Sequence, residues 1–340
     1  MSKRNISVCL GVDSEMSKET EETKSNLTKY QKLTDREHIL KKPDTYIGSI
    51  ENTEHTNYVF VEKTLPCSST INNNDQKSTG MPIDDDISDQ EEDIDSDGDM
   101  DVASEKCSPQ ENNNKEDNQS RIELKDIQYI PGLYKLFDEG IVNCRDHVIR
   151  QQQAVADKVE GALPVTNIDI TLDNDGTIHM YNDGNGIDVA EHPEYKIWIP
   201  EMIFGHLRTS TNYDEKKKEK IVGGKNGFGF KLVLIWSTWG RVETVDHIRG
   251  LKYTQEFKDN LTVIEKPKIN KTKIKPYTRV SFRPDYQRLG IDGLTEDMLS
   301  LFKKRVYDIS AVTSKSIKVK LNSQMIPCKS FEQYIDLYIG

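Results

Sequence analysis

The sequence of 340 residues lacks the features that mark secreted and membrane proteins. Its five cysteines are scattered, odd in number and never spaced as CxxC, which argues against a disulfide framework or a zinc site and fits a reducing compartment. No segment approaches the roughly 18 consecutive apolar residues of a membrane-spanning helix, and the N-terminus has no apolar signal core. We therefore expect neither secretion by a standard signal nor a membrane partner.

Basic residues are scarce in one part of the chain. The net charge is −11, but residues 82–120 alone hold 15 Asp or Glu and 2 Lys or Arg, which leaves the rest near +2. Residues 64–120 are rich in Ser, Asn, Asp and Glu, so they cannot bury enough apolar surface to offset their ordering entropy. We predict a disordered acidic insertion at 64–120 and a disordered tail at 1–28. The folded domain is then formed by 29–63 and 121–340.

The role of the insertion stays open at the level of sequence. A solvated spacer is the simplest interpretation of an acidic, polar segment. Mimicry of nucleic acid and binding of a partner protein are the alternatives.

Helix signals come first in the remaining sequence. Thr34 and Glu37 have the spacing of a capping box at the start of a short helix that stops before Pro43. Residues 57–63 are extended. Apolar residues then recur at helical spacing and predict an amphipathic helix over 132–152.

Strand signals dominate the sequence after this helix. Apolar alternation in 167–173, the turn residues Asn174-Asp175-Gly176 and the segment 177–181 predict a β-hairpin. Further helices are expected at 192–209, 229–238 and 295–310, and further strands at 241–247, 252–258, 261–266, 277–282 and 316–321; residues 331–339 fit either state. Because there is no strict βαβ alternation, we predict an α+β sandwich in which helices lie on one face of a mixed β-sheet.

Three polar residues lie in line on the helix predicted at 132–152. Glu139, Asn143 and His147 are spaced i, i+4 and i+8, so they share one side of the helix. A solvated helix face is the simple explanation. Asn is a poor helix former, however, and its place in mid-helix favours a binding role. Gly140, in the same helix, costs about 1 kcal/mol relative to Ala, and we expect it to serve close packing.

Two glycine-rich stretches indicate close approach of a ligand or of another segment. Asn182-Asp183-Gly184-Asn185-Gly186 directly follows a predicted strand. A polar loop with Gly223 to Gly229 precedes an apolar helix, an arrangement that suits a phosphate. It is not a Walker A loop, because Asn226 stands where Ser or Thr is required. A plain surface loop is the alternative.

Four segments, taken together and in this order, resemble one known family. They are KPDTYIGSIE at 42–51, PGLYKLFDE at 131–139, IFGHLRTSTNYD at 203–214 and GGKNGFGFKL at 223–232. They are similar to the N-terminal ATPase domain of eukaryotic-type DNA topoisomerase II, within the GHKL superfamily. The resemblance runs from about Tyr30 to Tyr338, interrupted by the acidic insertion. It implies the GHKL (Bergerat) ATPase sandwich.

The resemblance implies roles for the polar line and the first glycine stretch. Glu139 would be the general base that activates the attacking water, a task that suits a carboxylate. Asn143 would coordinate Mg²⁺, the expected cofactor, through its side-chain oxygen. Asn182 would accept a hydrogen bond from the adenine amino group. Gly184 and Gly186 would let the base pack against backbone.

The remaining implied contacts to ATP lie elsewhere. Thr278 would support the adenine site through water. Tyr30 matches a tyrosine that reaches the partner subunit's nucleotide. Ser210, Thr211 and Asn212 would contact ribose and α-phosphate. The phosphates would be wrapped by a closing lid formed by Gly224, Lys225, Asn226, Gly227, Phe228, Gly229, Phe230 and Lys231.

The chain departs from the family pattern at several positions. His147 replaces a usual Asn, which introduces a group that titrates near neutral pH. Lys225 replaces a usual Arg and loses the planar fork of donors. Phe230 replaces a small residue beside the phosphate loop. The chain ends at Gly340, about where the ATPase domain ends, so the transducer, TOPRIM and cleavage domains are expected to be absent.

The resemblance implies an ATP-hydrolysing gate domain of a type II DNA topoisomerase, which forms a homodimer on binding ATP and drives DNA strand passage. The alternative is a truncated nucleotide-binding module that binds ATP or dimerises without turnover or DNA cleavage. A sensor kinase is disfavoured, because it needs a phosphoacceptor His on a dimerising helix. DNA would be bound through the full-length enzyme and only weakly by this chain, because its folded part is near +2. The expected location is the nucleus, or the host cytoplasm or nucleus if a virus encodes the protein.

Overall fold

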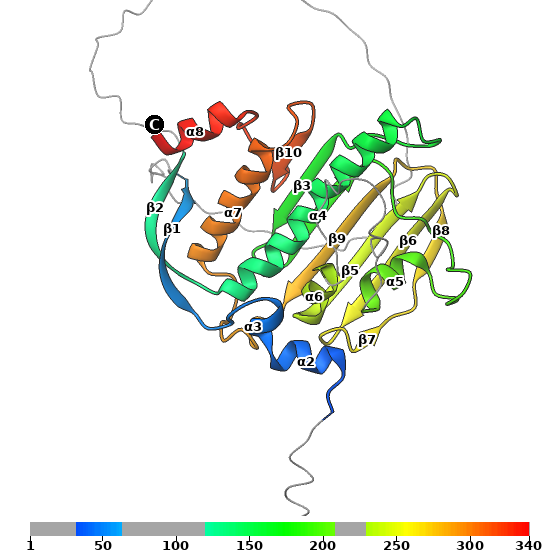
Figure 1. Ribbon diagram of the computed structural model, residues 1–340, viewed down its shortest axis with the longest axis horizontal. Coiled ribbons are helices and arrows are strands. Elements are labelled where there is room, and N and C mark those ends of the chain that lie inside the picture. Colours follow the sequence, from blue (N-terminus) through cyan, green and yellow to red (C-terminus); the bar gives the residue numbers. More distant parts are fainter. Residues whose placement is uncertain (1–31, 63–119, 208–228, 340) are drawn as a thin grey trace, which may run out of the picture. The chain divides into compact units, whose positions relative to one another are not determined.

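The computed structural model describes residues 32–62, 120–207 and 229–339 (Figure 1). The predicted tail at 1–28 and nearly all of the predicted insertion at 64–120 lie outside these ranges. Among the described residues, no helix is both long and apolar enough to cross a membrane.

One mixed sheet of nine strands forms the body of the domain. Its order is β11-β10-β3-β4-β9-β5-β6-β7, with β8 paired to β6. The pairing of β10 with β3 is parallel and the others are antiparallel. The strands are β3 Asn167–Leu172, β4 Ile178–Asp183, β5 Ser237–Asp246, β6 Leu251–Lys258, β7 Val263–Ile264, β8 Lys268–Lys271, β9 Tyr277–Pro284, β10 Lys318–Leu321 and β11 Gln324–Met325.

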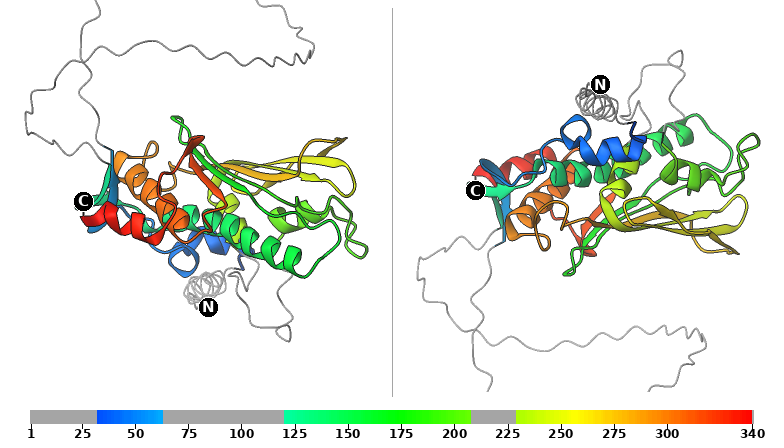
Figure 2. Two further views of the ribbon diagram at one scale, coloured as in Figure 1. Left: turned by 90° about the horizontal axis from the view of Figure 1, so that it is seen from above. Right: turned by 90° about the horizontal axis from the view of Figure 1, so that it is seen from below.

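The helices gather on one face of this sheet, as Figure 2 shows. This confirms the predicted α+β sandwich. The short helices are α2 Asp35–Lys41, α3 Pro43–Tyr46, α5 Ile199–Gly205, α6 Gly229–Ile235 and α8 Phe331–Ile339, and the long ones are α4 Pro131–Ala156 and α7 Glu296–Ala311. The capping box of α2 is also confirmed, because Thr34 and Glu37 bond each other's backbone N–H groups.

The predicted hairpin forms as β3–β4, with its turn at the predicted residues. Leu172 pairs with Ile178 across a turn in which Gly176 has a φ of +81°. The side chain of Asp175 accepts a hydrogen bond from the backbone N–H of Thr177 at 2.9 Å, which closes the turn. The alternation turns every second side chain of both strands toward the helices.

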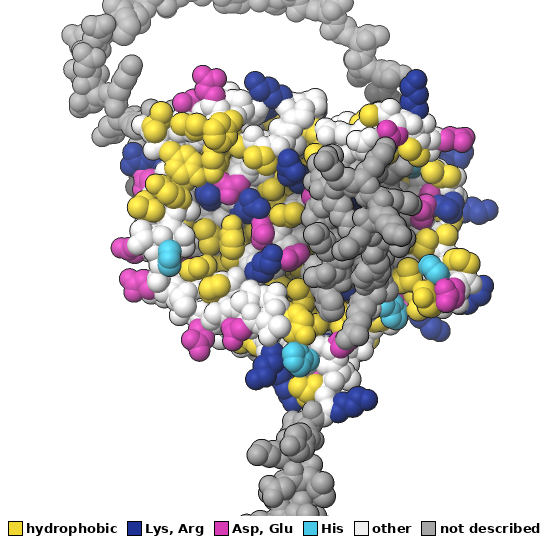
Figure 3. Space-filling model, in the orientation of Figure 1, with side chains coloured by type: hydrophobic (Ala, Val, Ile, Leu, Met, Phe, Trp, Pro, Cys, Tyr) yellow, Lys and Arg dark blue, Asp and Glu magenta, His cyan; other side chains and the backbone are white. Residues whose placement is uncertain are grey.

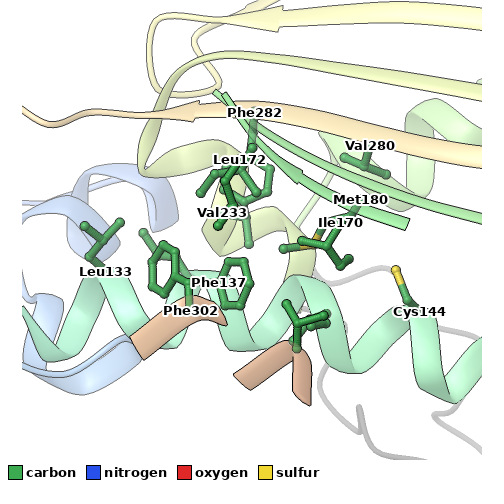
Figure 4. Close-up of a cluster of buried hydrophobic side chains, with 14 of the residues drawn as sticks. Leu133, Phe137, Cys144, Ile170, Leu172, Met180, Val233, Val280, Phe282 and Phe302 are labelled. Carbon is green, nitrogen blue, oxygen red and sulfur yellow. The ribbon is translucent and has the colours of Figure 1, made fainter. Parts of the chain in front are cut away.

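The core lies between α4 and the sheet (Figure 4). Phe137 of α4 stacks on Phe302 of α7 with ring centroids 4.1 Å apart, and both rings are fully buried. Met180 and Phe282 meet them from the sheet side. Each such side chain contributes about 1.5–3 kcal/mol through burial, so α4 is held firmly over the strands.

Some predicted elements were wrong in extent. The helix expected at 192–209 is reduced to α5, because Lys196 has a φ of +55° and Glu191 forms a bridge with Trp198. The helix expected at 229–238 ends at Ile235, since β5 begins at Ser237. The strand expected at 261–266 is only the two residues of β7, and β8 and β11 were not predicted.

A second, two-stranded sheet forms a ribbon where the chain before residue 62 meets the chain after residue 120. Strands β1 Thr53–Val61 and β2 Arg121–Tyr129 pair antiparallel along their whole length. Val61 lies opposite Arg121, so the chain leaves the domain after residue 61 and re-enters it beside the same point.

Apolar side chains are exposed near this ribbon and on α8 (Figure 3). One side of α8 is anchored, because the hydroxyl of Tyr334 donates to Asp308 of α7 at 2.5 Å and the ring of Tyr338 contacts Tyr58. The exposed members of the group are Tyr58, Leu124, Phe331, Ile335 and Ile339.

Candidate nucleotide-binding site

A cavity of about 200 Å³ separates the middle of α4 from strands β4 and β9. It is lined by side chains from each of these elements and from α5 and α6. The lining residues are Gly140, Asn143, Cys144, His147, Arg150, Met180, Asn182, Ile187, Ile203, Phe204, Phe230, Thr278 and Val280. Asn143 and His147 of the line predicted from sequence therefore line this cavity, whereas Glu139 is not among its lining residues and Asn143 is also exposed to solvent.

The acidic end of the line is Glu139. Its Oε1 forms an ion pair with Lys135, one turn earlier, with 2.8 Å between Oε1 and Nζ. A Cβ atom at Gly229 would lie 2.7 Å from its Oε2, so the start of α6 comes close to the carboxylate only because that residue is glycine. Glu139 thus faces the first residue of the helix that follows the glycine-rich loop.

The side chain of Asn143 has a defined orientation. Its Nδ2 donates to the backbone carbonyl of Glu139 within the helix. One of the two N–H donors of the amide is thereby used, so a ligand could meet the second N–H or the acceptor Oδ1. An amide oxygen is a hard ligand of the kind that Mg²⁺ prefers.

Asn182 lies in the opposite wall of the cavity, and its amide also donates to a backbone carbonyl. It is 6% exposed, and its Nδ2 donates to the carbonyl of Asp183 at 3.1 Å, which leaves Oδ1 as an acceptor. Thr278 on β9 pairs directly with Asn182 on the neighbouring strand β4. Its hydroxyl is 2.9 Å from that of Thr244. These groups make a small polar patch in an otherwise apolar wall.

Backbone conformation and close packing require glycine at the two positions after β4. Gly184 has a φ of +88°, a conformation that other residues rarely adopt. A Cβ atom at Gly186 would lie 2.0 Å from the carbonyl oxygen of Val245. Other segments of the chain therefore approach both glycines closely, Val165 at Gly184 and Val245 at Gly186.

The first residues of α6 complete one side of the cavity. Phe230 packs edge-on against Phe204 and Phe282, with ring centroids 5.5 and 6.0 Å apart, so its bulk belongs largely to the core. Lys231 is 4% exposed, and burial lowers its pKa to about 8.

Two further groups on α4 are perturbed by burial. The pKa of His147 is lowered to about 4, first by burial and then by the charge of Arg150. The expected titration of His147 near neutral pH is therefore wrong. Burial raises the pKa of the Cys144 thiol to about 12, so it stays protonated and is no nucleophile.

Sequence reasoning missed several members of the lining. Arg150 follows His147 by three residues on the same side of α4, a spacing that was visible in the sequence. Phe204 and Met180 had no such signal, because only the packing of α5 and β4 brings them here. The predicted residues Tyr30, Ser210, Thr211, Asn212, Gly224, Lys225, Asn226, Gly227 and Phe228 lie outside the described residues.

A larger hollow of about 430 Å³ lies on the opposite face of the sheet, where no helix of the described residues lies. Some of its polar groups are paired, since His179 is 2.8 Å from Asp173 and 2.7 Å from the hydroxyl of Ser281, whereas Oδ1 of Asn167 has no hydrogen-bond partner among the described residues. The cavity under α4, which has the amide groups of Asn143 and Asn182 in a largely apolar lining, is the better candidate for a ligand site.

A metal would find few protein ligands near α4. Within the described ranges, no group of three or more His, Cys, Asp or Glu residues is arranged to hold an ion. The oxygen of Asn143 alone suits Mg²⁺, which commonly keeps water and substrate phosphates as its other ligands. The residues present therefore fit a metal that arrives with a nucleotide.

Known proteins are similar in sequence to nearly all of this chain. No protein-family model matches it. It is 41% identical over 325 residues to DNA topoisomerase 2 of Acanthamoeba polyphaga mimivirus, which covers 96% of this chain and 21% of that protein. It is 34% identical over 313 residues to DNA topoisomerase 2 of Saccharomyces cerevisiae, covering 92% of this chain and 17% of the relative. The chain thus spans about a fifth of the length of these relatives.

Solved structures that resemble this chain belong to the same group of proteins as these relatives. The ATPase region of Saccharomyces cerevisiae topoisomerase II matches with a TM-score of 0.69 and 33% identity, over 92% of this chain and 65% of that one. The ATPase and transducer domains of DNA topoisomerase II from Balamuthia mandrillaris match with a TM-score of 0.67 and 31% identity, over 91% and 63% of the two chains. The chain is therefore a homologue of the ATPase region of eukaryotic-type DNA topoisomerase II, with the GHKL ATPase fold that its sequence predicts.

Proposed function

We propose that this chain is the ATP-binding and ATP-hydrolysing module of a type II DNA topoisomerase. The observation that carries the proposal is the cavity between α4, β4 and β9, which Asn143 and Asn182 line, with Glu139 one turn before Asn143 on α4. A carboxylate, a hard amide oxygen and a buried amide acceptor are the groups that hydrolysis, metal binding and base recognition respectively need.

Glu139 acts as the general base in this proposal. Its carboxylate lies next to Gly229, at the junction between the glycine-rich loop and α6, where the terminal phosphate would be held. There it orients and deprotonates the attacking water. Lys135 fixes the rotamer of Glu139 through the 2.8 Å ion pair, and one oxygen, Oε2, faces the loop side.

Asn143 holds Mg²⁺ through Oδ1 in the proposal. When bound, this ion neutralises charge on the phosphates. The donation from Nδ2 to the carbonyl of Glu139 keeps Oδ1 turned to the ligand side and so orients the amide beforehand.

The base end of the site is formed by β4 and β9. Asn182 accepts from the adenine amino group through Oδ1, and Thr278 supports the base through water. Gly184 and Gly186 keep the loop after β4 close to the base. Tyr30, Ser210, Thr211 and Asn212 contact the nucleotide, and the segment from Gly224 to Lys231 wraps its phosphates.

Dimerisation, DNA and location belong to the longer enzyme in this proposal. By analogy with the relatives named DNA topoisomerase 2, ATP binding brings two copies together and drives strand passage, with DNA bound mainly outside this chain. The nucleus, or the host cell for a viral enzyme, is the corresponding location.

Replacement of Glu139 tests the catalytic assignment. We expect the natural chain to bind and hydrolyse ATP, and Glu139→Gln to bind ATP within about twofold while turnover falls at least roughly 100-fold, because proton transfer contributes 10²–10⁴. Steady-state hydrolysis and calorimetric binding are measured on the same samples. Glu296→Ala, an exposed carboxylate at the start of α7, is the matched control and should change neither value.

A second function is favoured by one contact. Oε1 of Glu139 is already engaged by Lys135 at 2.8 Å, which fits a module that binds ATP without turning it over. Equal binding by the natural chain and Glu139→Gln, with no hydrolysis by either, would establish this alternative. Absence of nucleotide binding by the natural chain would contradict both functions.

A further inference from the structure

A lysine-rich segment follows the outer edge of the nine-stranded sheet. Strand β8 pairs with β6 on the side away from β5, so it lies at the margin of the sheet (Figure 1). Residues 266–275 comprise β8 and the chain on either side of it, and five of these ten residues are lysines with exposed side chains. We call them the edge lysines: Lys266, Lys268, Lys271, Lys273 and Lys275.

The edge lysines form no ion pair or hydrogen bond with any side chain in the described part of the chain. Cations close to them in the sequence are paired: Lys258 lies 3.1 Å from Glu265, and Arg249 lies 2.7 Å from Asp246. From residue 266 to residue 284 the sequence has five lysines, two arginines and no Asp or Glu. The edge is therefore a local excess of positive charge that the domain itself does not neutralise.

This local excess acts on a ligand although the whole chain carries a net charge of −11. At about 0.1 M salt, exposed charges more than about 10 Å apart are largely screened from each other. A ligand at the edge is therefore attracted mainly by the nearby lysines. Residues two apart along a strand are separated by about 7 Å, so the edge lysines form a row and suit a linear ligand with repeated negative charges.

The chemistry of the segment favours the phosphates of a nucleic acid over other acidic partners. Lysine is a compact point charge that suits phosphate, and a row of lysines neutralises a phosphate backbone without reading its sequence. A membrane-surface segment normally adds a broad apolar face, whereas Ile274 is the only large apolar side chain exposed between residues 266 and 275. An acidic protein partner is disfavoured because lysine is depleted in protein interfaces.

We propose that the edge lysines bind the phosphate backbone of duplex DNA, as a contact that this chain adds to those made elsewhere in the longer enzyme. The contact is separate from the candidate nucleotide site, since none of the edge lysines lines the cavity beside α4. It is weak, with a Kd on the order of 10⁻⁴–10⁻⁶ M at physiological salt, as is usual for sequence-independent binding. The choice of DNA as the nucleic acid rests on the proposed function.

The salt dependence of DNA binding tests the inference. Each lysine that neutralises a phosphate contributes about −0.9 to the slope of log Kobs against log salt concentration. Fluorescence anisotropy of a short labelled duplex gives this slope between about 50 and 200 mM salt for the full chain. Replacement of all five edge lysines by Gln should make the slope less steep by about 4 and weaken binding at least roughly tenfold at about 50 mM salt.

A matched variant has the same change of charge elsewhere. It replaces five exposed lysines that lie outside β5 to β9 by Gln: Lys41, Lys42, Lys315, Lys318 and Lys329. This variant should keep the natural slope to within about 1. Equal effects of the two replacements would overturn the inference, because net charge alone would then explain the binding.

Two further results would also overturn the inference. One is absence of DNA binding by the natural chain at about 50 mM salt. The other is tighter binding to anionic lipid vesicles than to DNA, lost when the edge lysines are replaced. ATP binding, measured by calorimetry on the same samples, should be equal in the natural chain and both variants. Failure of the natural chain to bind ATP would contradict the proposed function, whereas failure to bind DNA alone would leave its ATP-binding site standing.

Discussion

His147 makes the stability of the domain depend on pH. Its pKa in the folded protein, about 4, is below the ordinary value of 6.5, because burial disfavours the charged ring. As pH falls through 6.5, the unfolded chain takes up a proton that the folded chain refuses until about pH 4. Stability is therefore lost between these values, by up to about 3 kcal/mol. Below pH 4 both states are protonated and the loss stops.

His147→Phe should remove this part of the pH dependence. Urea unfolding at pH 7, 5.5 and 4.5 gives the free energy of unfolding of both proteins, and the difference between them isolates position 147, since their carboxylates are the same. The natural chain should lose more stability than the variant on acidification. Parallel pH profiles would show that the ring has the same pKa in the folded and unfolded chains and contradict the lowered pKa.

The candidate site shows what single residues can and cannot predict. The residue types and their spacing were sufficient to place Glu139, Asn143 and His147 on one side of a helix, while their roles toward ATP stay predictions from the resemblance. The orientation of the amides was not predictable, because it depends on the backbone carbonyls of Glu139 and Asp183, to which Asn143 and Asn182 donate. The state of His147 was mispredicted for the same reason, since burial on all sides is set by the fold.

Contact between α4 and β4 depends on one glycine. A Cβ atom at Gly140 would lie 2.3 Å from Sδ of Met180, which confirms that this glycine serves close packing. Gly140→Ala should gain about 1 kcal/mol in helix propensity and push the flexible Met180 side chain into the adjoining cavity. We therefore expect little change in melting temperature but roughly tenfold or greater weakening of ATP binding.

Two variants make this test specific. Gly293→Ala adds the same methyl group where no atom lies within 4 Å, and should leave ATP binding unchanged. Gly140→Ala combined with Met180→Ala vacates the space and should restore ATP binding, although burial lost at Met180 costs stability. Full ATP affinity in the single Gly140→Ala variant would mean that Met180 moves away from the cavity.

Helices and strands were predictable where a regular spacing of apolar residues continued over many residues. The helix at α4 and the hairpin β3–β4 agree with the sequence because apolar spacing and turn residues point to one structure. The segment before α5 does not, since its residues take their shape from a bridge between Glu191 and Trp198 and from the φ of +55° at Lys196. The short strands β8 and β11 form only because β6 and β10 offer them an edge, which no local pattern shows.

At the scale of the molecule, α7 and α8 connect the β1–β2 ribbon to α4, the helix that lines the candidate site. Asp138, the neighbour of Glu139 on α4, pairs with Arg305 of α7 at 2.8 Å, and Asp308 on the next turn accepts from Tyr334 of α8. The ring of Tyr338 then contacts Tyr58 of β1. The ribbon is thus anchored by contacts independent of residues 62–120.

The pairing of Val61 with Arg121 allows the predicted acidic insertion to be removed as a unit. Replacing residues 62–120 by a linker of six Gly and Ser residues shortens the loop about tenfold, or roughly three halvings. At about 0.6 kcal/mol each, the shorter loop should stabilise the domain by about 2 kcal/mol if the insertion is a disordered spacer. ATP binding should not change.

A second replacement distinguishes the effect of the amino-acid sequence of residues 62–120 from the effect of their length. A Gly and Ser segment as long as residues 62–120 keeps the closure entropy of a flexible loop, so it should leave the stability of the natural chain unchanged. Urea unfolding and ATP titration of the three proteins provide both readouts. Lower stability of both replacements would show that residues 62–120 contribute contacts to the fold, and altered ATP affinity in both would indicate that their acidic sequence acts on the nucleotide site.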